Sequence, residues 1–407
     1  MQLNALYVDF NSYFASVEQQ LQPELRNKPI GVLAVLAETT CCIAASYEAK
    51  AFGIKTGTMV RDARKLCKDI IFVEARPSLY VEYHHKLIAI VESCTHVEAV
   101  RSIDEMVCKL TGSQCEKENA LKLAAKIKKE INKQYKYIRC SIGIAQNTYL
   151  SKVASNMQKP DGCVVLEPHD IPDKLYTLKL RDLNGIGRQM EARLKRYKIE
   201  SIQQLYALNR DQLRTAWGSI EGERMFDKLR GLDPYYVKNA RSSLSHSHVL
   251  PPEQRNVLGA KAVLHRLLQK AAMRMRSYEL LTSRVSIKVK FRNHASFYAE
   301  SAISATDNTL TLTESLETLW QQYPKHDDPP IAVGVNFSSL VSLNDVAQDL
   351  FLEKPSATQQ RLNKALDTLN LKYGKNTVYF AGAHDALKDA PMRIAFNHIP
   401  NMIVEED

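Results

Sequence analysis

The sequence predicts an α+β protein of several domains, and three observations lead to this prediction. With 407 residues, the chain is too long for one ordinary hydrophobic core. Residues 1 to about 170 alternate short β-rich runs with helical stretches, whereas residues 171–235 have the pattern of helices throughout. A polar link, KNARSSLSHSH at 238–248, then precedes a strongly basic segment of helix and strand that ends near residue 340.

The alternation in the first region predicts individual elements. Short apolar runs bounded by turn signals predict strands, and apolar residues at helical spacing predict helices. The tail, 353–407, carries the stretch SATQQRLNKALDTLNLKYG and an irregular end. The expected strands are 5–10, 29–35, 70–75, 105–110, 138–146 and 163–168, and the two clearest helices are 78–94 and 119–135.

Composition and cysteine usage are those of a globular protein. The chain is 45% hydrophobic and 25% charged, and no run approaches the ~18–20 apolar residues of a membrane span. Its first residues carry no signal-peptide pattern. All eight cysteines lie in the first 163 residues without a C-x-x-C pair, which argues against a zinc site or a disulfide framework and favours reduced, cytosolic thiols. A net charge of +10 indicates a polyanionic partner.

The basic segment is more informative than the net charge. Between residues 255 and 292 there are ten lysines or arginines and one acid, Glu279. Its first part has apolar residues at helical spacing, and its second part alternates apolar and basic residues as a half-buried strand does. Two neighbouring elements with one sign of charge predict a surface that follows phosphates; a solvated helix face is the alternative. In the strand, Val285, Ile287, Val289 and Phe291 would face one side, and Arg284, Lys288, Lys290 and Arg292 the other.

Three acids raise a different question. The stretch RSIDEM places Asp104 next to Glu105 in an apolar run, 96–110, that has the pattern of a buried strand, and buried acids need a compensating charge. Asp9 ends the first expected strand, and acids from two strands, with substrate phosphates, suit Mg²⁺. Because adjacent strand residues point to opposite faces, Asp104 and Glu105 converge only if the backbone bends there, at a hairpin tip or a strand end. Taken alone, SIDE is more often a surface turn.

Five motifs, in this order and spacing, carry a family resemblance. VDFNSYFASVEQ, AASYEAKAFGIKTG, RSIDEM, SIGIAQNTYLSKVASNMQKPDG and LNGIG resemble the Y-family, or translesion, DNA polymerases of the bacterial polymerase IV and V kind. The likeness is strong to about residue 235 and weaker through the basic domain, and the tail also looks like bacterial members. It implies a right-hand fold: a ferredoxin-like palm (1–20 and 78–170), small fingers (21–77), a helical thumb (171–235), a linker (236–242), an α/β little finger (243–352) and a tail (353–407).

The resemblance also implies a catalytic site. Asp9, Asp104 and Glu105 would be the catalytic acids and, with the backbone carbonyl of Phe10, would hold two Mg²⁺ ions. Two divalent cations about 3.5–4 Å apart can neutralise clustered carboxylates. One would activate the primer 3′-hydroxyl, and the other would hold the dNTP triphosphate and stabilise the leaving pyrophosphate, so the protein supplies positioning and charge. A structural acid cluster is the alternative.

The nucleotide contacts come from the same resemblance. Tyr47 and Lys50 of the fingers and Lys159 of the palm would surround the triphosphate, and SYEAK would present the first two on one helical face. Phe14, five residues after Asp9, would lie beneath the sugar and exclude a ribose 2′-hydroxyl. Tyr13 is a second candidate here; both rings could instead be core aromatics of the first helix.

The chain departs from the family pattern at three positions. Many members have arginine where Lys50 stands, and an arginine would bind phosphate through two parallel hydrogen bonds. Many have a hydroxyl residue in place of Ala44, so one phosphate contact is expected to be missing. Lys109 stands where an acid often follows the catalytic pair. The first two changes predict altered nucleotide affinity rather than lost activity, because polymerase V-like members tolerate both.

Contacts to DNA and to a sliding clamp are implied in the second half of the chain. LNGIGRQMEARLKRYKI has the pattern of a helix-hairpin-helix, in which a glycine turn at a helix start points backbone N–H groups at a phosphate; a simple turn between packed helices is the alternative. VAQDLFLEK at 346–354 is similar to a clamp-binding peptide, and an amphipathic end of the last domain is the alternative. The candidate residues are Gly185, Ile186, Gly187, Arg188, Arg284, Lys288, Lys290 and Arg292 for DNA, and Gln348, Leu350 and Phe351 for the clamp.

The predicted function is low-fidelity, template-directed DNA synthesis across damaged bases, by a monomer acting on primer-template DNA in the cytoplasm at the nucleoid. Short fingers imply an open site that admits lesions, and no stretch resembles a proofreading exonuclease. Two rival functions are a catalytically weak or inactive accessory homologue recruited to a replication complex and a nucleotide cyclase with a related palm. The presence of all three acids argues against the inactive accessory homologue. The helix-hairpin-helix and the basic domain argue against the cyclase, because a cyclase does not need to bind DNA. An accessory subunit and the SOS damage response are further expectations from the family.

Overall fold

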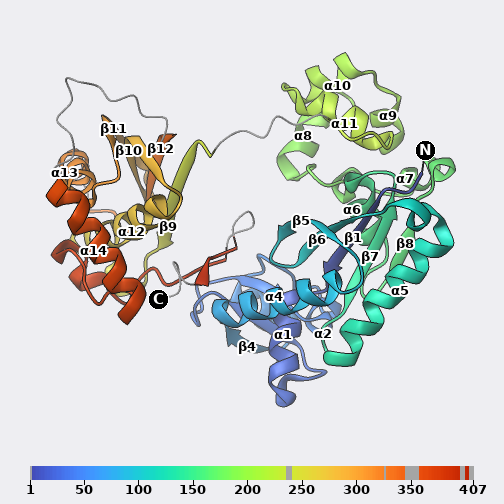
Figure 1. Ribbon diagram of the computed structural model, residues 1–407, viewed down its shortest axis with the longest axis horizontal. Coiled ribbons are helices and arrows are strands. Elements are labelled where there is room, and N and C mark those ends of the chain that lie inside the picture. Colours follow the sequence, from blue (N-terminus) through green and yellow to red (C-terminus); the bar gives the residue numbers. More distant parts are fainter. Residues whose placement is uncertain (1, 235–240, 325–326, 344–356, 395–398, 403–407) are drawn as a thin grey trace. The chain divides into compact units, whose positions relative to one another are not determined.

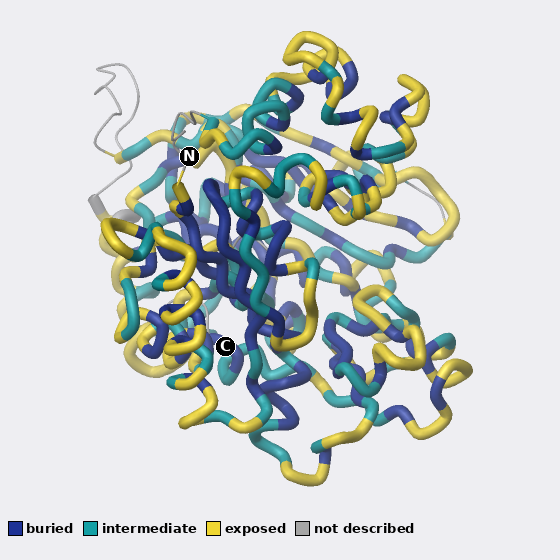
Figure 2. The backbone as a smooth tube through the Cα atoms, turned by 90° about the vertical axis from the view of Figure 1, so that its right-hand side faces the viewer, coloured by how far each residue is buried: buried dark blue, intermediate teal, exposed yellow. Residues whose placement is uncertain are grey.

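The computed structural model describes residues 2–234, 241–324, 327–343, 357–394 and 399–402. They belong to two compact units, Met1–Tyr236 with Ile394–Ile399 and Val237–Arg393 with Pro400–Asp407. Each unit has sheet and core of its own (Figure 1). Figure 2 shows buried chain in dark blue gathered inside, with exposed turns and loops in yellow around it.

A five-stranded sheet in the order β5-β6-β1-β7-β8 forms the centre of the first unit. β1 is buried at every position and pairs antiparallel with both β6 and β7, and helix α6 packs on β1 and β7. The strands expected at 5–10, 105–110, 138–146 and 163–168 and both expected helices are confirmed. The bounds are β1 (Ala5–Phe10), β5 (Val97–Ser102), β6 (Glu105–Lys109), β7 (Cys140–Ala145), β8 (Cys163–Val165), α4 (Pro77–Glu92), α5 (Lys117–Gln134) and α6 (Thr148–Met157).

The apolar run 96–110 is a hairpin and not one buried strand. β5 and β6 pair antiparallel, and Ser102 lies opposite Glu105 with Ile103 and Asp104 forming the turn between them. β5 is the edge strand of the sheet, so part of its apolar pattern faces outward, and Val100 is 40% exposed. The bend that the adjacent acids require is therefore present at Asp104.

A smaller sheet follows β1 in the chain. Its order is β3-β2-β4, with β2 antiparallel to β3 and parallel to β4. The expected strands at 29–35 and 70–75 are confirmed in shorter form, whereas β3 was not expected, because its four residues are too few to stand out from the surrounding small residues. The bounds are α1 (Tyr13–Leu21), β2 (Ile30–Leu33), β3 (Cys42–Ala45), α2 (Tyr47–Ala51), α3 (Val60–Leu66) and β4 (Ile71–Glu74).

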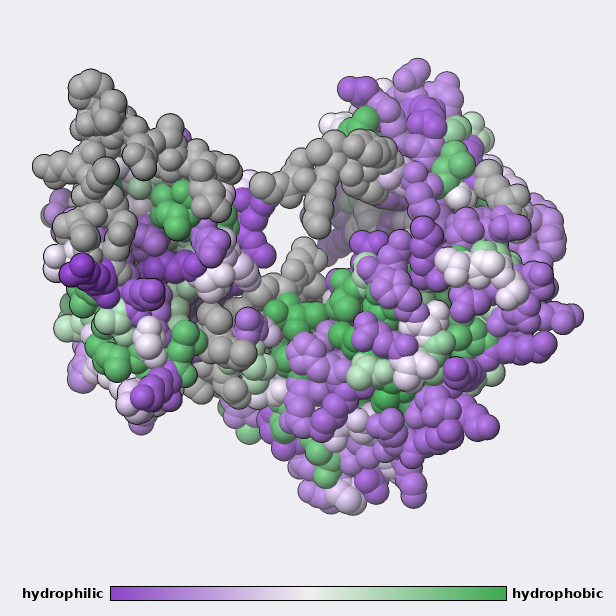
Figure 3. All heavy atoms as spheres, in the orientation of Figure 1, coloured by the Kyte–Doolittle hydropathy of each residue, from purple (hydrophilic) through white to green (hydrophobic). Residues whose placement is uncertain are grey.

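The next region is helical, as the sequence predicts. Short helices pack around a core that includes Leu194, Leu213 and Trp217. Figure 3 shows mostly hydrophilic (purple) atoms over these helices, at the upper right of the view. The bounds are α7 (Asp173–Tyr176), α8 (Arg188–Arg196), α9 (Ile202–Ala207), α10 (Arg210–Trp217) and α11 (Glu221–Leu229).

The second unit is built on a four-stranded antiparallel sheet in the order β11-β10-β12-β9. The long helix α12 packs on β9, β10 and β12, and α13 packs on β10 and β11. The apolar face of β10 is buried between sheet and helices, as its alternation predicts. The bounds are β9 (Ser243–Val249), α12 (Val257–Ser277), β10 (Leu280–Phe291), β11 (Phe297–Thr306), α13 (Thr309–Trp320), β12 (Pro330–Ser342) and α14 (Ala357–Tyr373).

The polar stretch 238–248 includes a strand in its second half. β9 begins at Ser243 and pairs with β12, with Leu244 buried opposite Phe337. Only one side of this edge strand faces the core, so a single apolar residue among serines and histidines is enough to seat it.

The basic part of α12 was interpreted wrongly as a surface for phosphates. Arg266 is 5% exposed and Arg274 is 8% exposed, so both guanidinium groups are buried. Arg276 forms two parallel hydrogen bonds, of 2.6 and 2.7 Å, with Asp367 of α14. Lys270 donates to the backbone carbonyl of Ala390 at 2.9 Å. Three of these cations face the end of the chain, whereas Arg274 lies beside Tyr278 and His246 of β9. The density of charge in a sequence does not indicate such directions.

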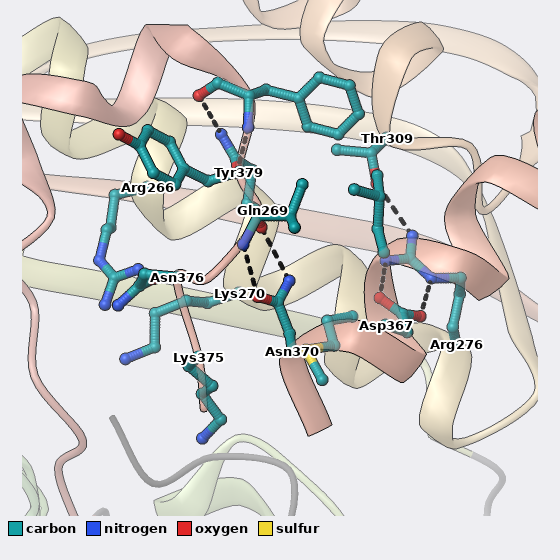
Figure 4. Close-up of a pocket in the computed structure, with 14 residues that line it drawn as sticks. Arg266, Gln269, Lys270, Arg276, Thr309, Asp367, Asn370, Lys375, Asn376 and Tyr379 are labelled. Carbon is teal, nitrogen blue, oxygen red and sulfur yellow. Dashed lines mark hydrogen bonds and ion pairs between the residues drawn. The ribbon is translucent and has the colours of Figure 1, made fainter. Parts of the chain in front are cut away.

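Two reciprocal amide contacts hold this end of the chain in place, one with α12 and one within the tail itself (Figure 4). The side-chain amide of Gln269 donates to the carbonyl of Phe380 and accepts from its N–H, both at 3.1 Å. Asn370 does the same to Val378, at 2.8 and 3.1 Å. Residues 357–393 of the tail are thus integral to the second unit.

Two expectations about the environment of the chain can be compared with the structure. All eight cysteines are free thiols, as their spacing predicts. Among the helices that the structure describes, none combines the length and the apolar character needed to cross a membrane.

Candidate active site

The site begins with two acids on neighbouring strands. Asp9, near the end of β1, lies directly opposite Glu105, the first residue of β6, in the antiparallel register. Asp9 is only 3% exposed. Directly paired residues point to the same face of a sheet, so the two carboxylates emerge together.

Asp104 reaches the same place because it stands at the hairpin tip. Its backbone carbonyl accepts a 2.9 Å hydrogen bond from the N–H of Phe10, which ties the tip to the end of β1. The Ser102 hydroxyl donates to the Asp104 carboxylate at 2.6 Å. Behind the turn, the buried ring of His84 on α4 donates from Nδ1 to the carbonyl of Ile103 at 2.7 Å, so α4 fixes the backbone that carries Asp104.

Two lysines neutralise the acids. The ammonium of Lys152, on α6, contacts Asp9 Oδ2 and Glu105 Oε1 together. Lys159 donates to the other oxygen of Asp9, Oδ1, at 2.7 Å, and the Tyr7 hydroxyl donates to Glu105 Oε2 at 2.9 Å. Sequence reasoning missed Lys152 and Tyr7. The signal for Lys152 was a lysine inside the apolar helix YLSKVAS, and that for Tyr7 was a hydroxyl two residues before Asp9 on a buried strand.

The charges of the site perturb one another. Burial raises the pKa of Asp104 to about 6, and the neighbouring charges of Glu105 and Asp9 act in the same direction. Burial and then the charge of Asp9 raise the pKa of Tyr47 to about 12. Burial and then the charge of Lys159 lower the pKa of Lys50. The three predicted triphosphate residues are therefore close enough to Asp9 to share its electrostatic environment, and the Lys50 ammonium lies 4.4 Å from the centre of the Tyr47 ring.

The donor set suits a hard cation, although the three acids do not form a single tight cage. Carboxylate oxygens from two strands and a hairpin tip are the ligands that Mg²⁺ prefers. Among the residues that the structure describes, only Glu167, His169 and Asp170 bring three ligand atoms within 4.8 Å of one another. Because Lys152 contacts both Asp9 and Glu105, Asp104 is the member that lies farther away.

The two aromatic candidates lie in different surroundings. Tyr13 is 3% exposed, and its hydroxyl donates to the backbone carbonyl of Tyr80 at 2.6 Å, so it has a core role. Phe14 is partly exposed and stacks on the Tyr80 ring, with ring centres 4.4 Å apart. The stack holds the Phe14 ring in one orientation at the start of α1.

Comparisons with known proteins agree on one family. Residues 8–156 match the model of the impB/mucB/samB family, residues 241–350 match its C-terminal domain, and residues 181–233 match the DNA polymerase-iota thumb domain. A DNA polymerase IV of Moorella thermoacetica is 32% identical over 92% of this chain and 95% of its own length. A DNA polymerase IV of Pelotomaculum thermopropionicum is 30% identical over 93% of this chain and 94% of its own length. The chain belongs to the Y family of DNA polymerases.

Solved structures show the same fold. A Y-family DNA polymerase chimera of Dbh and Dpo4 covers 83% of this chain and 99% of its own, with a TM-score of 0.71 at 22% identity. An insertion ternary complex of Dbh DNA polymerase has a TM-score of 0.57 over the same shares. The right-hand α+β fold predicted for a Y-family member is thereby confirmed.

In the thumb of this Y-family chain, the glycine turn has the predicted form. Gly185 has φ +92°, a left-handed conformation that suits glycine, and Gly187 caps α8 in an extended conformation. A side chain added at Gly187 would meet nothing within 4 Å, so this side of the turn is open. Arg188 is exposed, whereas Ile186 is a core residue whose N–H already donates to Leu183. Ile186 thus anchors the turn and offers no free donor.

In the little finger, the basic face of β10 divides into two kinds of residue. Lys288, Lys290 and Arg292 are exposed, while Arg284 forms a 2.9 Å ion pair with Glu300 of β11. Directly opposite Lys288 is Tyr298, which is 57% exposed and was not predicted as a site residue. An exposed ring among cations suits stacking on bases or sugars.

The remaining candidates are the clamp-binding residues and two positions that depart from the family pattern. The clamp candidates Gln348, Leu350 and Phe351 lie outside the described residues. Ala44 lies in β3 opposite Val32 and is nearly buried. Lys109 is exposed at the end of β6, and its charge helps to lower the pKa of Asp233, although burial of that acid outweighs this effect.

Proposed function

We propose that this chain is a template-directed DNA polymerase that inserts nucleotides opposite damaged bases with the help of two Mg²⁺ ions. The observation that carries the proposal is the convergence of Asp9, Asp104 and Glu105 at one end of the β1–β6 pair. Tyr47, Lys50 and Lys159 share the electrostatic environment of Asp9. An acidic centre beside cationic and hydroxyl side chains suits a metal-bound triphosphate.

The three acids share one task in this proposal, which is to hold the metal ions. Asp9 and Glu105 face each other across the strand pair and would hold the ions, together with Asp104 and the Phe10 carbonyl. When bound, the ions would lower the pKa of the primer 3′-hydroxyl and would stabilise the negative charge of the leaving pyrophosphate. The protein contributes a rigid frame, because the hairpin tip is tied to β1 through the Phe10 amide and to α4 through His84. Such fixed positioning is the main contribution of proteins to phosphoryl transfer.

The nucleotide would be held from two sides. Lys50 and Tyr47 on α2 would contact the triphosphate from the fingers, and Lys159 would contact it from the loop after α6. Phe14, stacked on Tyr80, would lie against the sugar and exclude a 2′-hydroxyl by its volume. Ala44 offers no hydroxyl for a further phosphate contact, so nucleotide affinity rests on these charged and aromatic groups.

DNA would be held by backbone contacts in the thumb and by side-chain charge in the little finger. The open turn at Gly185–Gly187 and the exposed Arg188 would position one phosphate group, without reading bases. Lys288, Lys290 and Arg292 would follow the phosphates of the duplex, and Arg284 would contribute less because Glu300 already binds it. A sliding clamp and an accessory subunit are further proposed partners, in a cytoplasmic, nucleoid-associated enzyme.

Primer extension on a template with an abasic site tests the proposal. We expect the wild-type chain to extend the primer past the lesion in Mg²⁺, and Asp104→Ala to stop extension on damaged and undamaged templates alike. No extension by the wild-type chain on either template would instead favour the accessory-protein alternative.

A further inference from the structure

Lys152 holds a position that no step of the proposed reaction uses. Its ammonium contacts one oxygen of Asp9 and one of Glu105, and its side chain is only 16% exposed. It also lies 5.0 Å from the centre of the Tyr7 ring, whose hydroxyl binds the second oxygen of Glu105. One cation thus joins two acids that stand directly opposite each other on β1 and β6.

The helix that carries Lys152 cannot move away from the acids easily. α6 lies directly on β7 at Gly143, where an added Cβ would come within 2.0 Å of the Ser151 carbonyl oxygen and 2.3 Å of the Ser155 nitrogen. Asn147 caps the start of α6, and its amide donates to the carbonyls of Lys228 and Leu232 in the thumb at 3.0 and 2.8 Å. Backbone packing therefore sets the distance between Lys152 and the strands.

Lys152 and Lys159 differ in what they face. Lys159 donates to Asp9, and its charge lowers the pKa of Lys50, although burial of Lys50 has the larger effect. Lys159 therefore belongs to the side of the site where the triphosphate would lie. Among the described residues, the charged head of Lys152 meets Asp9, Glu105 and the Tyr7 ring that supports Glu105, so it serves the acids and not the nucleotide.

Like charges directly opposite each other on paired strands repel, and the repulsion is stronger where water is excluded. A shared ammonium removes the repulsion and fixes the distance between the two carboxylates. The same ammonium occupies oxygen lone pairs that a divalent cation needs, and its positive charge repels that cation.

We propose that Lys152 is a positioning residue that sets the spacing of Asp9 and Glu105 and, by competing for their oxygens, keeps divalent cations weakly bound until a nucleotide adds its own negative charge. The inference rests on the proposed metal site and adds a control on its occupancy. It requires two opposite effects of a neutral replacement: tighter binding of the bare ion and slower catalysis.

Mn²⁺ titrated into the full-length chain, without DNA or nucleotide and followed by electron paramagnetic resonance of the free ion, measures the first effect. We expect Lys152→Met to bind Mn²⁺ on the order of tenfold more tightly than the wild type, because a charged competitor is removed. Lys152→Arg keeps the charge and should stay close to wild type. Lys128→Met removes a palm lysine of similar burial, paired with Asp161, and should leave Mn²⁺ affinity unchanged.

Steady-state primer extension measures the second effect: kcat of Lys152→Met should fall while the KM for dNTP changes little. Unchanged or weaker Mn²⁺ binding by Lys152→Met would overturn the proposal, as would a higher KM with an unchanged kcat. If Lys152→Met does not fold, Lys152→Gln replaces it in both measurements. Asp9→Asn separates the two levels of inference. Mn²⁺ affinity that does not depend on Asp9 contradicts the metal site itself, whereas affinity that depends on Asp9 but not on Lys152 contradicts only the role of Lys152.

Discussion

Two charged regions of the molecule use their charge in opposite ways. In the palm, Asp9 and Glu105 are held by partners on every side: a lysine shared by both, a second lysine on Asp9 and a tyrosine on Glu105. In the little finger, Lys288 and Lys290 project from a strand into solvent. A buried charge with fixed partners therefore acts as part of a unit, whereas exposed charges of one sign each contribute separately to binding.

The largest effect should come from breaking the palm unit. Asp9→Ala removes the acid that both lysines bind, and we expect the rate of primer extension to fall by on the order of 10³-fold or more, because fixed electrostatic groups of active sites commonly have such effects. Single-turnover extension on an undamaged template measures it. Glu130→Ala, which removes a partly exposed acid paired with Lys133, is the control and should keep wild-type activity. A decrease of less than tenfold for Asp9→Ala would show that the unit is not catalytic.

The next effect concerns Phe14, whose ring stacks on Tyr80. Phe14→Ala should admit ribonucleotides, raising their kcat/KM relative to deoxynucleotides by about 100-fold, because a pocket without the ring no longer collides with a 2′-hydroxyl. Competition between dATP and ATP opposite a template thymine gives the ratio. Phe10→Leu, a change in the buried core next to Asp9, controls for general loosening of the site. Equal sugar discrimination in Phe14→Ala and wild type would remove the gate role.

His84 links the palm unit to the stability of the fold. Burial lowers the pKa of His84 to about 4, so the folded state keeps the ring neutral while the unfolded chain protonates near pH 6.5. The contribution of His84 to the free energy of unfolding is therefore fully present above about pH 6.5. As the pH falls toward 4, the free energy of unfolding decreases by up to about 3 kcal/mol. His84→Ala should flatten that pH dependence in urea unfolding and lower kcat about tenfold, because the Ile103 carbonyl loses its donor.

His248 provides the matched control. Burial also lowers its pKa to about 4, but it belongs to the second unit, whereas the three acids belong to the first. His248→Ala should change the pH dependence of unfolding and leave kcat as it is. Equal kcat values for both histidine variants would show that α4 does not position the hairpin tip.

The smallest effects should separate the two basic elements of the little finger. Charge reversal of Lys288 and Lys290 should flatten the dependence of log K on log salt for duplex binding by about 0.9 for each phosphate that is no longer neutralised, without affecting stability. Arg276→Ala should leave the dependence of log K on log salt unchanged. It should lower the free energy of unfolding by about 2–3 kcal/mol, because Asp367 loses its partner. Fluorescence anisotropy at several salt concentrations and urea unfolding distinguish these results. A changed slope for Arg276→Ala would restore α12 as a DNA-binding face.

Sequence reasoning succeeded where pattern and direction coincide. The alternation of β10 correctly predicted which residues are buried, because the period of a strand alone determines the two faces. The adjacent acids correctly required a bend, which the Ile103–Asp104 turn supplies. The reasoning failed on α12, where Arg266 and Arg274 look like surface cations but bury against the tail and the sheet, and it failed on Lys152. The errors on Arg266 and Lys152 have one cause: their partners lie more than 20 residues away in the chain, so no local pattern records them.

Gly143 makes the active site vulnerable at a position with no side chain. Replacing it with alanine would look conservative and would touch no acid, base or aromatic ring, yet the new methyl would lift α6 from the sheet and withdraw its lysine. A mutation scan restricted to polar residues would overlook such a loss-of-function allele, and a variant with an intact set of reactive groups could still be inert.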